Sequence, residues 1–128
     1  MNDAMDSLSD LERNVLFALA EDDPERETLL RQIESARVAD RDYTGVGLYT
    51  KLTVNPDVPK LTTTNRLIED YPKLGLIHPD LEAGAGVILW LDEAKIDTIE
   101  FYTFSGDWPK DEAAFKIDKP NKTLDTKT

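Results

Sequence analysis

Apolar side chains recur at helical spacing near the start of the chain. The first set consists of Leu11, Val15, Ala18 and Leu19. Their spacing predicts a helix with one apolar face. Ser9 and Glu12 have the spacing of a capping box, in which each side chain accepts a hydrogen bond from the other residue's backbone N–H. We therefore expect a helix that begins after Ser9 and ends near Ala20.

A second helix is predicted directly after the first. The stretch Asp-Pro-Glu at residues 23–25 favours a helix start, because proline suits the first helical position and acids suit the positive end of the helix dipole. The apolar residues that follow on one face are Leu29, Leu30, Ile33 and Ala36. The short connection predicts an antiparallel αα-hairpin, at about residues 9–39, that covers one face of a sheet.

From Tyr43 onward the pattern of apolar residues changes to an alternation. Between Val46 and Val54 the even positions are apolar apart from Thr50, and the odd positions are Gly, Tyr, Lys and Thr. This alternation predicts a half-buried strand ended by two prolines. Residues 67–71 and 74–78 are predicted to be shorter extended segments, the second closed by proline.

A hairpin is predicted next. Residues 87–91 are apolar at every position, which indicates a central strand buried on both faces. Residues 92–95 then predict a tight turn, and residues 96–104 return antiparallel. Ile96 and Ile99 have opposite parity, which indicates a bulge or an edge position near Asp97 and Thr98.

These elements predict an α+β fold, with the N-terminal αα-hairpin packed on a mainly antiparallel sheet of four or five strands. We expect one domain over residues 1–115, with the sheet at about 43–104 and a flexible tail at 116–128. Eight residues are predicted to lie in the core: Leu30, Ile33, Val46, Leu48, Leu52, Leu89, Leu91 and Ile99.

Composition and charge narrow the classes of partner. The chain has 26 acidic and 15 basic residues in 128, a formal net charge of −11, and no cysteine. A negative field of this size repels phosphate backbones and anionic membranes, so we expect no nucleic acid or membrane partner. The absence of cysteine fits a reducing compartment, and no stretch has the pattern of a secretory signal or a membrane span, so we expect a cytoplasmic protein. Residues 1–42 alone carry twelve acidic and five basic side chains, a balance of −7.

Few residues offer catalytic or metal-binding chemistry. His78 is the only histidine, so with no cysteine we expect neither a metal site nor another cofactor. Asp97 and Glu100 would lie on opposite faces of a regular strand, and only a bulge would bring them together for two-carboxylate chemistry. Residues 84–86, Gly-Ala-Gly, precede a strand rather than a helix and so do not form a phosphate loop.

Part of the chain resembles a family of short, uncharacterised bacterial proteins. The stretches that carry the resemblance are residues 45–49 (Gly-Val-Gly-Leu-Tyr), 78–89 with Leu-Glu-Ala-Gly-Ala-Gly, 95–100, Tyr102 and the pair Trp108-Pro109. The chain departs from that family at Ala94, where a hairpin glycine is usual. The resemblance covers about residues 43–109 and implies no activity, cofactor or catalytic residue.

Two functions from different classes remain open. The first is a non-catalytic protein-interaction module, such as an inhibitor, an immunity-like protein or an adaptor. Its partner is unknown, and the acidity of the chain favours a basic protein. Its candidate contact residues are Asp22, Asp23, Glu25, Tyr49, Tyr102 and Trp108. The alternative is a small hydrolase or ligand-binding protein with a pocket between helices and sheet. Its candidate residues are His78, Glu82, Asp97 and Glu100. The sequence leaves the oligomeric state open.

The glycines at positions 45 and 47 share one strand face with Tyr49. Their missing side chains predict a shallow depression in which an aromatic ring packs. The occupant is either Trp108 of the same chain or a side chain of a partner.

Overall fold

A computed structural model describes residues 6–62, 67–69 and 74–118 of the chain. The helices α1 (Asp10–Glu21) and α2 (Arg26–Ser35) come first. The later elements are β1 (Arg37–Tyr43), β2 (Gly47–Thr53), β3 (Leu67–Glu69), β4 (Gly75–His78), β5 (Leu81–Asp92), β6 (Lys95–Thr103), the 3-10 helix η1 (Glu112–Ala114) and β7 (Lys116–Asp118).

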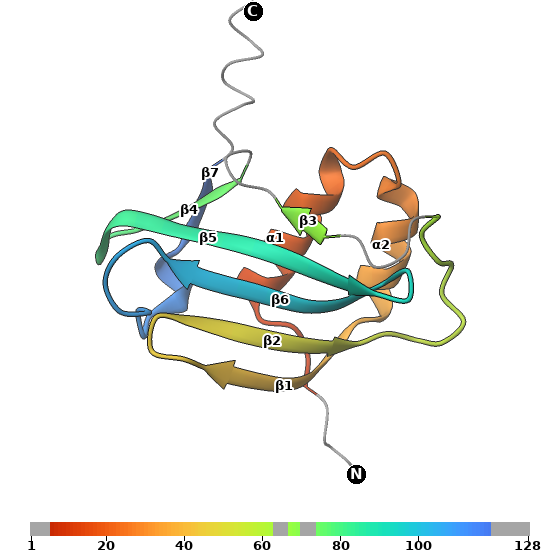
Figure 1. Cartoon of the computed structure of the whole chain (residues 1–128), viewed down its shortest axis with the longest axis horizontal. Coiled ribbons are helices and arrows are strands. Elements are labelled where there is room, and N and C mark those ends of the chain that lie inside the picture. Colours follow the sequence, from red (N-terminus) through yellow and green to blue (C-terminus); the bar gives the residue numbers. More distant parts are fainter. Residues whose placement is uncertain (1–5, 63–66, 70–73, 119–128) are drawn as a thin grey trace, which may run out of the picture.

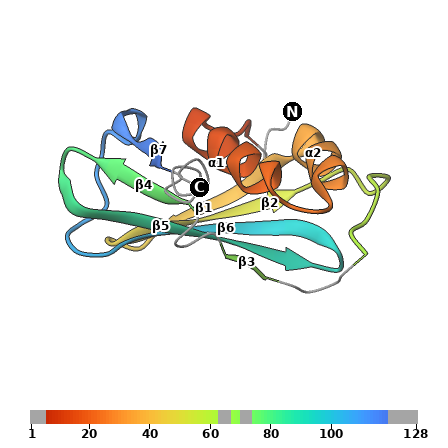
Figure 2. The same ribbon diagram turned by 90° about the horizontal axis from the view of Figure 1, so that it is seen from above.

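The strands form one antiparallel sheet, and both α-helices pack on the same face of it (Figures 1 and 2). Six strands follow one another in the order β1-β2-β6-β5-β4-β7, and the short β3 pairs with β5 beside them. The predicted α+β class, with N-terminal helices over an antiparallel sheet, is therefore confirmed. The described sheet has more strands than the four or five expected.

The first additional strand, β1, lies where the second helix was expected to end. Arg37–Tyr43 pairs with β2 at the edge of the sheet, and within it only Val38 is buried. A bulge between Val38 and Asp40 interrupts the alternation. Because charged residues dominate this edge strand, its hydrophobic pattern is too weak to be recognised in the sequence.

The second additional strand, β7, lies in the predicted flexible tail. Lys116–Asp118 pairs with β4, and Ile117 of this strand is opposite Leu76. The expectation of a tail from residue 116 is therefore wrong for these three residues. Residues 119–128 lie outside the described part of the chain, as do residues 70 and 71 of the expected 67–71 strand.

The observed start of α1 agrees with the start predicted from the sequence, whereas that of α2 differs. At α1 the predicted capping box is present: Glu12 N donates to Ser9 Oγ at 3.1 Å, and Ser9 N donates to Glu12 Oε1 at 2.8 Å. At α2 the helix begins at Arg26, so Pro24 lies in the turn before the helix rather than at its first position.

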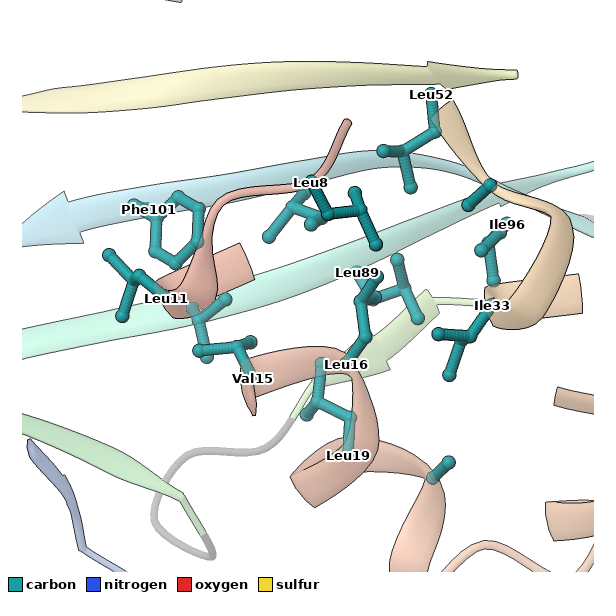
Figure 3. Close-up of a cluster of buried hydrophobic side chains, with 14 of the residues drawn as sticks. Leu8, Leu11, Val15, Leu16, Leu19, Ile33, Leu52, Leu89, Ile96 and Phe101 are labelled. Carbon is teal, nitrogen blue, oxygen red and sulfur yellow. The ribbon is translucent and has the colours of Figure 1, made fainter. Parts of the chain in front are cut away.

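The hydrophobic core fills the space between the helices and the sheet (Figure 3). Six of the eight predicted core residues are buried: Ile33, Leu48, Leu52, Leu89, Leu91 and Ile99. Leu30 is partly buried. Val46 is 52% exposed, because β2 begins one residue later and Val46 belongs to the preceding turn.

The hairpin of β5 and β6 differs from the prediction in the burial of β5. Val87, Leu89 and Leu91 are buried, but Trp90 between them is 43% exposed, so the strand is not buried on both faces. The reason is that the two helices cover only one face of the sheet (Figure 2). The predicted tight turn is present, with positive φ at Glu93 (51°) and Ala94 (67°).

The predicted bulge is also present. Trp90 pairs with Thr98 and Leu91 pairs with Ile96, which leaves Asp97 as the extra residue on β6.

Neither described α-helix is long and apolar enough to span a membrane.

Candidate interaction surface

The candidate site lies on the outer face of the sheet, opposite the helices. Cross-strand pairing places Asp42 of β1, Tyr49 of β2, Glu100 of β6 and Ile88 of β5 in one row across the strands. Trp90 lies two residues beyond Ile88 on β5, so it points to the same face. Tyr49 is 41% exposed and Trp90 is 43% exposed. We call the five residues Asp42, Tyr49, Ile88, Trp90 and Glu100 the outer row.

Glu100 is the centre of the outer row. Tyr49 Oη donates to Glu100 Oε2 at 3.1 Å, and Trp90 Nε1 donates to Glu100 Oε1 at 2.9 Å. The hydrogen bond to Glu100 and the charge of this carboxylate raise the pKa of the Tyr49 hydroxyl. Two aromatic side chains from different strands therefore hold one partly exposed carboxylate in a fixed orientation.

Among the described residues, the charges on and beside the outer row sum to a negative value. Lys51 Nζ lies 3.2 Å and 3.3 Å from the two carboxylate oxygens of Asp97, and Thr98 Oγ1 also donates to Asp97 at 2.7 Å. The positive charge of Lys51 is thus matched by Asp97. Asp42 and Glu100 remain on either side of Tyr49.

The bulge changes the expected relation between Asp97 and Glu100. Asp97 contacts Lys51 and Glu100 contacts Tyr49, and these two partners lie two residues apart on one face of β2. Both carboxylates therefore reach the outer face. This agrees with the prediction that Asp97 and Glu100 could share one face only if the strand contained a bulge. Each is bound by its own partner.

Tyr102 lies at one end of the outer face. A side-chain carbon added at Gly86 would come within 2.6 Å of the Tyr102 ring, so this ring covers Gly86. Tyr102 also contacts Phe104 edge to face, with 5.6 Å between ring centroids. Next to Phe104, the β4–β5 hairpin borders a shallow depression of about 500 Å³ that Glu82 helps to line.

Trp108, the third aromatic candidate, lies away from Tyr49 and Tyr102. Its ring stacks on Phe115 at 4.8 Å and contacts Phe101, a core residue, at 5.6 Å. Its backbone N donates to Gly45 O at 2.9 Å, so Trp108 does lie beside one of the two glycines. Gly47 instead lies against the backbone carbonyl of Phe101, which leaves no room for a side chain.

A second carboxylate near Trp108 has similar donors. Trp108 Nε1 donates to Glu112 Oε2 at 2.8 Å, and Tyr43 also forms a side-chain hydrogen bond with Glu112. Burial raises the pKa of the Tyr43 hydroxyl, and the Glu112 charge raises it further. Lys110 lines the adjacent depression of about 370 Å³ together with these residues.

The acidic candidates of the helical hairpin are part of its turn. Asp23 Oδ1 accepts a hydrogen bond from Glu25 N at 2.8 Å, and Glu25 Oε1 accepts one from Thr62 N at 2.8 Å. Asp22 caps the end of α1. These acids lie on the helix side of the sheet, so the structure does not bring them together with Tyr49 and Tyr102 (Figure 2).

The alternative pocket residues are not brought together either. His78 is 3% exposed, its Nδ1 accepts from Asp80 N at 2.9 Å, and its Nε2 lies 2.8 Å from Asp111 O. Both ring nitrogens therefore serve the fold, with the proton assigned to Nε2. Glu82 is exposed on β5, and Asp97 and Glu100 reach the outer face. Within the described ranges, no three His, Asp or Glu side chains are grouped to hold a metal ion.

The contribution of Trp90 to the outer row is not among the residues predicted from the sequence. Its signal was present, because Trp90 occupies the position that alternates with Leu89 and Leu91. The continuous apolar run concealed this alternation. The hydrogen bonds that join Tyr49, Glu100 and Trp90 depend on strand pairing that the local pattern does not specify.

Comparison with known protein families, with curated proteins and with solved structures finds no significant match to this chain. The resemblance of residues 43–109 to short bacterial proteins therefore remains a prediction. Function is inferred from the geometry and charge described above.

Proposed function

We propose that the chain is a non-catalytic protein-interaction module that binds a basic partner protein through the outer face of its sheet. The observation that carries the proposal is the outer row, in which exposed Tyr49 and Trp90 flank the carboxylate of Glu100. Tyrosine and tryptophan are among the side chains most enriched in the residues that supply binding energy at protein interfaces.

The arrangement of the apolar side chains supports an interface. Scattered exposed apolar residues are normal on a protein surface, whereas large contiguous apolar patches mark contact sites. Tyr49, Ile88 and Trp90 come from two strands on either side of β6, and Glu100 of β6 links the two aromatic side chains. The outer row thus spans neighbouring strands of a hydrogen-bonded sheet, which presents it as a rigid surface.

Charge supports a basic partner. The net charge of −11 attracts a positively charged surface over a long range and accelerates encounter. Asp42 and Glu100 extend this negative charge onto the outer row itself. The aromatic contacts then supply the short-range energy that slows dissociation.

A photo-crosslinking experiment tests the proposal. A benzophenone amino acid replaces Asp40, which is exposed on β1 in the same cross-strand row as Lys51, Thr98 and Trp90. The control places the same group at Asn14, which is exposed on α1. Irradiation in extracts of the source cells should yield a discrete crosslinked protein from position 40 and not from position 14.

The substitution Trp90→Ala should abolish this crosslink, whereas Phe17→Ala should preserve it. Phe17 is a matched control, because it is as exposed as Trp90, at 43%, but belongs to α1. The proposal is wrong if position 40 captures no discrete protein, or if the capture is indifferent to Trp90→Ala.

A further inference from the structure

The Glu100 carboxylate retains capacity to bind a ligand. Each of its oxygens accepts one hydrogen bond within the chain, Oε2 from Tyr49 and Oε1 from Trp90. An ionised carboxylate has about four lone-pair sites, so roughly half of them remain for an incoming donor. The two hydrogen bonds also hold the carboxylate in place, which reduces the entropy lost when a ligand binds.

The neighbouring rings favour one kind of donor. A guanidinium group is planar, offers two parallel N–H groups to a carboxylate and stacks on aromatic faces. An ammonium group is a compact and strongly hydrated charge that uses such a surface less well. Tyr49 and Trp90, each more than two fifths exposed, offer aromatic surface on both sides of Glu100.

The local charge also favours a cation. Asp42 lies beyond Tyr49 in the same cross-strand row, and its charge acts on the Tyr49 hydroxyl. Lys51, a described cation on this face, contacts Asp97 at 3.2 Å. An arriving positive side chain therefore meets Glu100 and Asp42 without competition from Lys51.

From this geometry we infer that Glu100, between the rings of Tyr49 and Trp90, receives an arginine side chain from the basic partner. This inference rests on the proposed function and adds the chemistry of recognition. The partner segment is thus defined by an exposed arginine rather than by positive charge alone.

The chain contains its own comparison site. Glu112 also accepts from an indole and forms a hydrogen bond with a tyrosine, but the Trp108 ring stacks on Phe115 and contacts Phe101. Lys110 lies in the depression beside it. Glu112 therefore has the same kinds of donor, and Tyr43 at 56% is even more exposed than Tyr49 at 41%, but the Trp108 ring packs against other aromatic rings and a lysine lies beside the site. The two tryptophan indole N–H groups report on the two sites separately.

The test is a titration of the full chain, labelled with nitrogen-15, with a short glycine–arginine repeat peptide. The indole N–H resonance of Trp90 should shift in a saturable way while that of Trp108 moves little, and Trp90→Phe assigns the two signals. The matching glycine–lysine peptide should bind at least about tenfold more weakly. Equal affinity for the two peptides would overturn the inference, because charge alone would then explain the binding.

Substitution at the carboxylate separates specific recognition from the general field. Glu100→Gln should weaken binding of the arginine peptide by at least about tenfold, because it removes the charge-assisted hydrogen bonds. Glu82→Gln, at an exposed position of β5, removes the same charge and should have little effect. If both variants weaken binding equally, or neither does, the inference is wrong. Unchanged amide spectra outside the outer row show that each variant remains folded.

The outcomes distinguish this inference from the proposed function. Capture of a partner from position 40 that persists in Glu100→Gln would overturn the arginine site and leave the interaction module intact. A Trp90 response that is selective for arginine and lost in Glu100→Gln would support the site. Failure of capture at position 40 would overturn the proposed function whatever the peptide shows.

Discussion

Glu12 of α1 and Arg41 of β1 form a two-point ion pair beneath the first helix. Arg41 Nε donates to Glu12 Oε2 and Arg41 Nη2 donates to Glu12 Oε1, both at 2.8 Å, and the Glu12 residue is 1% exposed. Thr50 Oγ1 and Ser9 N also donate to this carboxylate, each at 2.8 Å. One side chain therefore caps α1 and joins it to strands β1 and β2.

The first prediction concerns the stability supplied by this pair. Arg41→Met should destabilise the fold by about 3 kcal/mol, because it leaves the buried Glu12 charge without its cation. The value is at the low end for buried pairs, since the Arg41 side chain is 26% exposed. Arg26→Met is the matched control: its pair with Glu27 is exposed, at 51% and 86%, and its loss should cost less than about 0.5 kcal/mol. Urea unfolding measures both, and equal costs would contradict the assignment.

The second prediction is a pH dependence. Burial raises the pKa of the Glu12 carboxyl, but hydrogen bonds from Arg41, Ser9 and Thr50 lower it by more, so the pKa in the folded state lies below the usual value of 4.5. The folded state then binds this proton less readily than the unfolded state. The stabilisation is complete above pH 4.5 and is lost as the pH falls through the folded pKa.

Urea unfolding between neutral pH and strongly acidic pH tests this dependence. Glu12→Gln should be less stable than the wild type at neutral pH, and the difference should shrink as the pH falls below the unfolded pKa. A difference that stays constant across this range would show that ionisation of Glu12 does not contribute.

The third prediction concerns the two faces of β5. Leu89 is 2% exposed, and Leu89→Ala should destabilise the fold by about 2 to 5 kcal/mol through lost burial and a residual cavity. Trp90→Phe, at the next residue on the outer face, should change stability by less than about 1 kcal/mol. Chemical denaturation compares them, and a loss well under about 1 kcal/mol for Leu89→Ala would contradict the described core.

The fourth prediction concerns the close approach of β2 and β6. A side-chain carbon at Gly47 would collide with the backbone carbonyl of Phe101, which cannot move without separating the strands. Gly47→Ala should therefore destabilise by at least about 1 to 3 kcal/mol. Gly75→Ala in β4 is the control, because its nearest contact would be Asp118 O at 3.9 Å. Thermal unfolding should separate the variants clearly, and coincident transitions would refute the prediction.

Local patterns predicted those parts of the fold that local interactions determine. The capping box of Ser9 and Glu12 and the turn at residues 92–95 depend on neighbours in the chain, and both were recognised. Arg41 meets Glu12 across 29 positions, and no local pattern reports such a contact. Strand β1 was missed because it lies at the sheet edge, where charged residues replace the alternation.

The outer row was only partly predictable for a related reason. Tyr49 was recognised as an aromatic residue on an amphipathic strand, and Glu100 only as a member of a catalytic pair. Trp90 belongs to the run 87–91 that was predicted to be buried on both faces. Whether helices cover one face of the strand or both depends on segments far away in the sequence, so the local pattern could not decide it. Which face of the sheet the helices leave uncovered is evident only in the complete fold (Figure 2).

The most direct test of the outer face as a binding surface is hydroxyl-radical footprinting of the chain with and without the partner captured from position 40. Trp90 and Phe17 suit this comparison, because each is 43% exposed and they belong to β5 and α1 respectively. Binding at the outer face should protect Trp90 and Tyr49 from oxidation and leave Phe17 unchanged. Protection of Phe17 with undiminished oxidation of Trp90 would place the interface on the helices and contradict the account.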